Sequence, residues 1–332
     1  MNFRKTLLTV AFMAVCGFYG SAQAQLNTDI YGLRNQANSD FQSIASFVNG
    51  PFVNSLGFFT SLGWDNTPSV YDLMSIPGPH FSLSVGAGAD FIPLPNLNNL
   101  TGLNVVSASS NFSLPSGVPL PFPVVTVRMG LFQGMDAGFR YTTIPSVSVG
   151  GVGGTFTGWG LDLRYKLFDG GELPTVTLVT SFDSMTGNVS ISTGNINQTG
   201  INYTAPNGDN YPNASLTGSS IYALNWNTQS VGAMVMIGKS TVILYPFAGV
   251  GFQRNSGTIT SSLNGSYTAN LGDGSTPLTI NPSGVSAGTP VVLEPKFEAG
   301  LNFGAGLGIN WMVMAESNGT DLAASTSFLL AF

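Results

Sequence analysis

The chain has 332 residues, of which only 8% are charged, and it contains 42 glycines and carries a net charge of −6. Soluble domains usually contain about 25% charged residues, so this composition argues against a conventional water-exposed surface. The acidic balance also argues against nucleic acid as a partner.

Residues 1–24 have the pattern of a secretory signal peptide. Arg4 and Lys5 precede an apolar run over residues 7–19, and Ala22 and Ala24 frame a small-x-small cleavage site. The run is shorter than the roughly 20 apolar residues that a spanning helix needs. Cys16, the chain's one cysteine, lies in this leader. We therefore expect a mature chain without disulfides, a thiolate nucleophile or a thiolate metal site.

Residues 25–79 form a separate N-terminal segment in which the hydrophobic period is helical. Apolar residues recur every three or four positions, which predicts a short amphipathic helix that ends at Gly50-Pro51. They are Ile30, Leu33, Ala37, Phe41, Ile44 and Val48. Three placements stay open for this segment: a plug inside the remaining fold, an arm beneath it in the periplasm, or a segment docked on its rim. Outside the plug its role would be packing alone.

Strand patterns begin at His80 and continue to the end of the chain. Residues 81–91 alternate apolar side chains with Ser and Gly, and Asp90 falls on the polar face. The proline-rich stretch 93–123 predicts a looser region, with a weak strand over 103–114. A hairpin follows over 125–141, in which Leu131 is expected opposite Met135. The stretch 145–154 is expected to be a glycine-rich loop, and no helix pattern follows it as a phosphate site would require.

The stretch 155–168 indicates the fold class most directly. Trp159, Leu161 and Leu163 share one face with other apolar residues, whereas Asp162, Arg164 and Lys166 lie on the opposite face. In a soluble sandwich the apolar face turns inward and the outer face is usually rich in charge. Because charge is scarce elsewhere in this chain, we predict a closed barrel whose apolar face points to lipid.

Further strands are expected over 175–182, 296–303 and 307–315. Tyr222, Leu224 and Trp226 are expected to lead through a short loop to a strand over 231–237. The polar tracts 185–216 and 254–290 predict long outer loops, because outer-membrane barrels have short periplasmic turns and longer loops outside. The second tract is expected to carry partial strands over 259–263 and 267–271.

The last strand alternates up to the terminal aromatic residue, with Phe328, Leu330 and Phe332 on one face. This pattern resembles the final strand that the barrel-assembly machinery reads in outer-membrane barrels. The resemblance implies that these three residues form the assembly signal and that the machinery is a partner.

Charged residues from several strands all fall on the polar face of the expected barrel. In lipid each would be costly, so we predict that they line the lumen and either pair across it or leave a narrow polar channel. The candidates are Arg128, Asp136, Arg140, Asp162, Arg164, Lys166, Lys296 and Glu298.

The sequence contains few residues that could take part in catalysis. His80 is the one histidine, which excludes a metal site built on several imidazoles. We predict no catalytic residue, no metal site and no cofactor.

The order of leader, helical arm and glycine-rich barrel resembles a family of uncharacterised outer-membrane proteins common in Bacteroidota. The arm carries Phe47, Pro51 and Gly57 and leads to Leu62-Gly63-Trp64. More distantly it is similar to barrels of the long-chain fatty-acid transporter type, which carry an N-terminal hatch. The resemblance implies an outer-membrane barrel with a hatch-like segment and assigns no functional residue.

Taken together, the patterns predict an all-β protein: a transmembrane antiparallel barrel of about 12–14 strands over 80–332, with a short helical N-terminal segment, in the outer membrane of a Gram-negative bacterium. The expected function is a channel or transporter for a small or hydrophobic solute whose identity is unknown. A non-conducting surface or adhesive barrel and a lipid-modifying enzyme are the alternatives.

Overall fold

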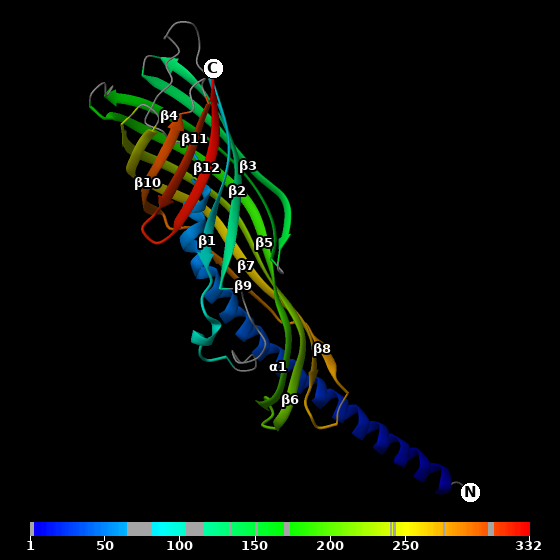
Figure 1. Ribbon diagram of the computed structural model, residues 1–332. Helices are drawn as coiled ribbons and strands as arrows, with labels where there is room; N and C mark the ends of the chain where they lie inside the picture. Colours follow the sequence, from blue (N-terminus) through cyan, green and yellow to red (C-terminus); the bar gives the residue numbers. More distant parts are fainter. Residues whose placement is uncertain are drawn as a thin grey trace.

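The computed structural model describes residues 3–64, 81–103, 116–132, 134–149, 152–168, 173–239, 241, 244–274, 276–304 and 309–332, with the side chains of α1 described from Tyr31 onward. Within these residues it forms one long helix and one antiparallel sheet of twelve strands (Figure 1). The elements are α1 (Phe3–Thr60), β1 (Phe81–Pro93), η1 (Leu97–Asn99), β2 (Gly117–Phe132), β3 (Met135–Val149), β4 (Val152–Phe168), β5 (Thr175–Thr204), β6 (Asn210–Gly238), β7 (Leu244–Asn270), β8 (Leu278–Ile280), β9 (Ser283–Gly288), β10 (Leu293–Gly304), β11 (Ile309–Ser317) and β12 (Leu322–Ala331).

The sheet closes on itself and forms the barrel that the sequence predicts. Each strand from β1 to β7 pairs with the next, β7 pairs with β10, and β12 pairs with β1. The described sheet has twelve strands, but its closed ring has fewer than the 12–14 predicted for the barrel. Ten of them make the ring, because β8 and β9 pair with the part of β7 that lies beyond it.

The outer face of the ring is apolar and the inner face is polar, as predicted for 155–168. Trp159, Leu161 and Leu163 of β4 are exposed, while Asp162 and Arg164 at the alternate positions are buried. Exposed apolar side chains around a closed barrel form the band that lipid covers. Among the described helical residues, no stretch is apolar and long enough to cross a membrane as a helix.

Three strands continue well past the ring and form an extension. β5, β6 and β7 have 30, 29 and 27 residues, against 9 to 17 for the other ring strands. The prediction of long loops over 185–216 and 254–290 is therefore wrong over most of these stretches. The partial strands expected over 259–263 and 267–271 lie within β7, except for Leu271. The inner faces of β5, β6 and β7 carry buried apolar residues that pack on α1, and this packing holds the polar tracts as strands. These residues include Ile191, Leu216, Leu224, Ile259 and Leu263.

β6 changes the direction of its apolar face at the boundary between extension and ring. Leu224 and Trp226 point inward to α1, whereas Val231 and Val235 point outward. The short loop predicted between these sets is wrong, since β6 is continuous from Asn210 to Gly238. The apolar side faces the helix in the extension and lipid in the ring. The apolar residues named here therefore move from even-numbered to odd-numbered positions within a single strand, while even-numbered residues stay on the inner side.

α1 runs through Gly50-Pro51 to Thr60, so the predicted end of the helix is wrong. A proline inside a helix costs about 3 kcal/mol through the lost hydrogen bond and ring clash. The turns after it bury Phe52, Leu56 and Phe59 almost completely. Each such side chain contributes about 1.5–3 kcal/mol on burial, which offsets the cost.

The proline-rich region contains the first half of β2 instead of a loose segment. Pro119, Pro121 and Pro123 are exposed and pair with β1 on one side. The ladder between β2 and β3 begins only at Val124, opposite Thr142. The prolines therefore occupy a local strand edge, where a missing N–H breaks no ladder. The weak strand over 103–114 lies outside the described residues except for Leu103.

Two smaller predictions about β3 are also wrong. Phe132 pairs with Met135, and a bulge between Gly130 and Phe132 moves Leu131 out of the predicted position. The expected loop over 145–154 is largely strand, because β3 and β4 pair as far as Val149 and Val152.

Candidate functional site

The C-terminal end of α1 lies inside the ring, where its side chains meet the barrel wall. Phe59 packs edge-on against Phe156 of β4 at 5.4 Å between ring centroids, and against Phe122 of β2 at 6.0 Å. Phe58, Phe59 and Leu62 are at most 1% exposed. The helix therefore fills the middle of the barrel at this level.

Two cations from different parts of the ring bind the last carbonyls of the helix. Arg140 Nη2 of β3 donates to the Thr60 carbonyl at 2.6 Å, and Lys296 Nζ of β10 donates to the Ser61 carbonyl at 2.9 Å. The last carbonyls of a helix lack intrahelical partners and carry partial negative charge. The two side chains thus satisfy the helix end and fix its position.

Trp64 and two carboxylates complete this arrangement. Trp64 Nε1 donates to Asp183 Oδ1 at 3.0 Å, and Arg140 pairs with the same oxygen at 2.7 Å. The Gly63 N–H donates to Glu316 Oε1 at 2.9 Å, and Glu316 Oε2 lies 3.0 Å from Lys296 Nζ. We call residues 60–64, together with Arg140, Asp183, Lys296 and Glu316, the latch.

Glycine in the wall leaves room for the latch. A Cβ at Gly160 of β4 would lie within 2.8 Å of the Trp64 ring and would also collide with the Asp183 carboxylate. The guanidinium of Arg140 lies over the same indole at 5.2 Å from the ring centroid. Trp64 is therefore enclosed between the wall and a cation, a contact worth about 2 kcal/mol when desolvated.

A second buried charge cluster lies closer to the short turns of the barrel. Arg128 contacts Asp162 at 2.8 Å and Asp136 at 3.1 Å. Arg164 grips Asp136 with two bonds, Nε to Oδ1 at 2.8 Å and Nη2 to Oδ2 at 2.6 Å. Removal of one partner from such a buried pair costs about 3–5 kcal/mol, because the other charge stays buried.

The eight charged residues named from the sequence are distributed over these two clusters and the wall. Four of them, Arg128, Asp136, Asp162 and Arg164, form the second cluster, and Arg140 and Lys296 belong to the latch. Glu298 is buried on β10, and Lys166 is partly exposed near the end of β4.

Sequence reasoning missed Asp183 and Glu316, although both lie one residue past a predicted strand. The predicted strands stopped at Phe182 and Ala315. The two-residue period continued by one position would have placed both carboxylates on the inner face. Trp64 carried no such signal, because it precedes the strand region.

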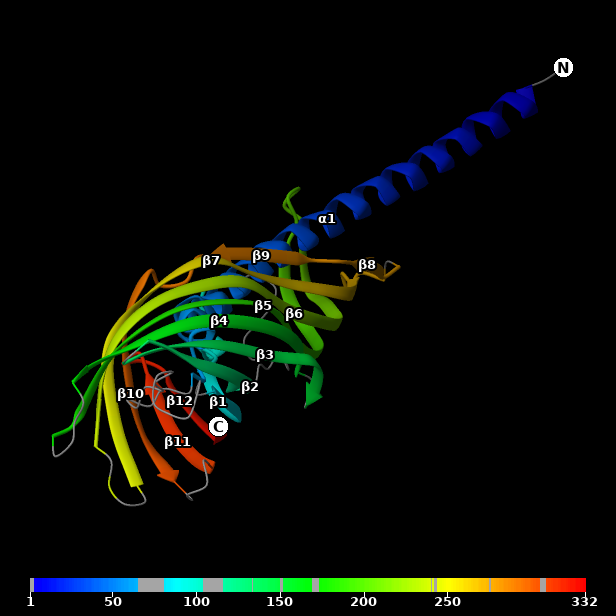
Figure 2. The ribbon, with the colours of Figure 1, turned by 90° about the horizontal axis from the view of Figure 1, so that it is seen from above.

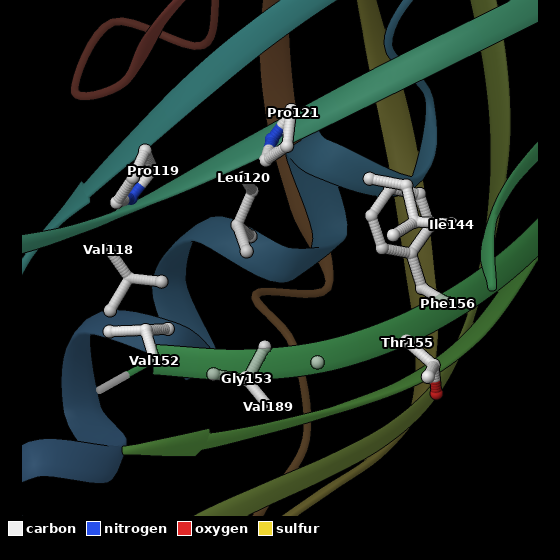
Figure 3. Close-up of a pocket in the computed structure, with 11 residues that line it drawn as sticks. Val118, Pro119, Leu120, Pro121, Ile144, Val152, Gly153, Thr155, Phe156 and Val189 are labelled. Atoms are coloured by element: carbon white, nitrogen blue, oxygen red, sulfur yellow. The ribbon is translucent and has the colours of Figure 1, made fainter. Parts of the chain in front are cut away.

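An apolar pocket opens through the wall between β2 and the β3–β4 hairpin (Figure 3). It lies where β2 has no ladder with β3, next to the three prolines. The cavity has a volume of about 50 Å³, and all the space between its atoms, including open solvent, amounts to about 370 Å³. The lining residues are Val118, Pro119, Leu120, Pro121, Ile144, Val152, Gly153, Gly154, Thr155, Phe156 and Val189.

A metal site would need several His, Cys, Asp or Glu side chains to lie together in the described part of the chain. Among those residues, no three His, Cys, Asp or Glu side chains group in a way that could hold a metal ion. His80, the one candidate histidine, lies outside the described residues.

Residues 95–315 match the model of a protein family whose function is unknown. No curated protein matches the chain. Among solved structures, the outer membrane protease OmpT from Escherichia coli is 9% identical with a TM-score of 0.35, over 77% of this chain and 95% of that one. The translocator domain of the autotransporter NalP from Neisseria meningitidis is 10% identical with a TM-score of 0.30, over 78% and 90%. The attachment invasion locus protein Ail from Yersinia pestis is 8% identical with a TM-score of 0.25, over 76% and 98%.

Proposed function

The chain belongs to the DUF6588 family of unknown function, and we propose that it is an outer-membrane barrel that takes a small apolar solute into its wall pocket and passes it beside the helical plug α1. The observation that carries this proposal is the apolar pocket at a place where the wall lacks a hydrogen-bonded ladder. The resemblance in residue order to hatch-bearing barrels agrees with it.

The outer membrane is the proposed location because of the exposed apolar band around the ring. Short turns join the strands at the end where Phe332 lies, and the extension occupies the opposite end. Outer-membrane barrels place short turns in the periplasm and longer segments outside. The Phe332 end is thus assigned to the periplasm and the extension to the cell exterior.

The pocket suits an apolar molecule because its surroundings offer mostly hydrocarbon. Val118, Leu120 and Ile144 are at most 8% exposed and form its inner side. Pro119 and Pro121 have no N–H, so β2 cannot close the gap to β3 with a regular ladder there. The opening is therefore built into the sequence of β2.

The floor of the pocket touches the plug. Phe156 lines the pocket and also packs on Phe59 of α1. A solute that moves inward from the pocket meets α1 next, so its passage requires a shift of the helix. The cavity volume of about 50 Å³ suits part of a slender group such as an alkyl chain, because drug-sized ligands need about 300 Å³ or more.

Binding of the slender fluorescent polyene cis-parinaric acid to the refolded mature chain tests the proposal. We expect saturable binding to one site, and about tenfold weaker binding after Val152→Phe, which fills the pocket. Ser190→Phe is the matched control, because Ser190 is exposed on the neighbouring β5 opposite Gly153 and does not line the pocket. Equal binding by both variants, or no saturable binding by the wild type, would refute a wall-pocket site.

A non-conducting structural barrel is the second candidate, favoured by the filled interior. α1, the latch and the second charge cluster together occupy the described bore. In that case the probe would bind without crossing. Proteoliposomes that report arrival of the probe inside the vesicle separate the two functions.

A further inference from the structure

The contacts of α1 with the extension follow the helix in order from the ring to the tip. Thr60 bonds to Thr228 at 2.6 Å inside the ring. Farther out, Ser261 donates to the Ala45 carbonyl at 3.2 Å, and the Ser283 N–H donates to Asn38 at 2.9 Å. The N-terminal direction of α1 therefore leads away from the ring.

The helix reaches the far tip of the extension near Gly32. A Cβ at this glycine would collide with Tyr203 and Pro206, which lie where β5 turns toward β6. From Gly32 to Thr60 the helix covers about 42 Å at 1.5 Å per residue. Figures 1 and 2 show α1 continuing beyond the sheet at this end, opposite the C-terminus.

The barrel itself begins at the other end. The Phe81 N–H donates to the Phe332 carbonyl at 2.9 Å, so β1 starts where the chain finishes. Gly32 at one end and Trp64 inside the ring show that residues 32–64 run lengthwise from the tip of the extension into the barrel, whose first strand starts at the other end with Phe81.

We infer that the barrel carries its own N-terminal segment across the membrane, so that the start of the mature chain is displayed on the outside. Which side is outside rests on the proposed function; the threading rests on the contacts alone. In this arrangement α1 runs from the outer tip of the extension to the latch inside the ring.

The chemistry of the helix fits this placement. Leu33, Phe41 and Val48 are fully buried against the extension, whereas Tyr31 is 60% exposed at the tip. Withdrawal of the segment to the other side would expose that buried face and leave the inner faces of β5, β6 and β7 uncovered. The extension therefore binds the displayed helix through apolar contacts along the length of the helix.

Single cysteines and a membrane-impermeant maleimide on intact cells test the inference. In a Cys16→Ala background the mature chain has no other thiol. Tyr31→Cys reports the start of the packed helix, Asn202→Cys reports the tip of the extension, and Leu173→Cys reports a short turn. All three side chains are exposed. Heat-modifiable migration on gels selects the variants that have assembled.

We expect Tyr31→Cys and Asn202→Cys to be labelled in intact cells, and Leu173→Cys only after lysis. Labelling of Asn202→Cys with protection of Tyr31→Cys would overturn the threading. If Tyr31→Cys and Asn202→Cys are both protected while Leu173→Cys is labelled, the threading stands and the proposed orientation fails. The two proposals are thus distinguished by the same set of variants.

Discussion

Asp183 holds two parts of the molecule with one carboxylate. It accepts from Arg140 of the wall and from Trp64 of the plug, and it is fully buried. Its loss would leave the guanidinium without its ion pair in a low-dielectric site. The latch thus couples the stability of the barrel to the position of α1.

The first prediction concerns this carboxylate. Asp183→Ala should lower the free energy of unfolding by about 3–5 kcal/mol, as expected when one member of a buried pair is removed. Urea unfolding of the refolded chain, followed by tryptophan fluorescence, measures the change. Asp209→Ala, at the exposed tip, is the control and should cost at most about 1 kcal/mol. A similar cost at the two positions would show that the latch contributes no stability.

The second prediction concerns the outer face of the ring. Leu161 is 51% exposed on β4, and Leu161→Lys should cost about 2–4 kcal/mol if the position is in mid-membrane. Asn225→Lys places the same residue on the exposed outer face of the extension, where a substitution costs at most about 0.5 kcal/mol. Refolding into lipid vesicles compares the two. Equal tolerance would contradict the assignment of the apolar band.

At the level of elements, the sequence predicts the strands of the ring better than those of the extension. Alternation over 155–168 indicates a lipid-facing strand because one face is apolar and the opposite face carries three charged residues. The tracts at 185–216 and 254–290 also alternate, with residues such as Ile191, Leu216 and Leu263 in inner positions. These apolar residues need a partner that is distant in sequence, so their role depends on α1 and could not be inferred locally.

Dependence on partners that are distant in sequence also explains why the end of α1 and the latch could not be predicted. Gly50-Pro51 is a sound local stop signal, and burial of the following turns inside the barrel overrides it. The inner position of seven of the eight named charged residues follows from their parity in the sequence. Their division into two clusters does not, because Arg128–Asp162 and Arg140–Asp183 join strands that are not neighbours in the sheet. The pocket depends on an absent ladder, which no residue pattern alone reveals.

The third prediction concerns the pH dependence of the extension. Burial raises the pKa of Tyr267 to about 12 and raises the pKa of Tyr222 as well. The unfolded chain loses these protons near pH 10, whereas the folded chain keeps them to a higher pH. The two tyrosines therefore do not lower the free energy of unfolding below pH 10. They lower it as the pH rises from about 10 to 12, by up to about 1.4 kcal/mol per pH unit for each group.

Tyr267→Phe tests this with little change in packing, since Tyr267 stacks edge-on against Phe41 of α1 through its ring. The variant should lose less stability than the wild type between pH 10 and 12 in urea unfolding. An identical decline in both proteins would mean that Tyr267 titrates normally.

At the scale of the whole molecule, assembly depends on the seam where the chain closes the barrel. β1 and β12 pair from Ser82 to Ala89, and Phe332 closes the ladder against Phe81. Phe328 and Phe332 are 62% and 69% exposed on the outer face. Their position at the seam agrees with the assembly role expected from the sequence, which stays a prediction.

Deletion of Phe332 should therefore lower the amount of heat-modifiable protein in the outer membrane several-fold, while deletion of Asn207 at the exposed tip should leave it nearly unchanged. Membrane fractionation followed by gels of heated and unheated samples measures both. Recovery of the wild type in the soluble periplasm would contradict the outer-membrane location itself.

Planar-bilayer conductance tests most directly whether the barrel is filled by its own threaded helix. The refolded mature chain should conduct little, because α1 and the latch occupy the bore. A variant lacking residues 25–64, first shown to assemble by heat-modifiable migration, should produce large, steady currents. Equal conductance of the two proteins would show that α1 does not close the barrel.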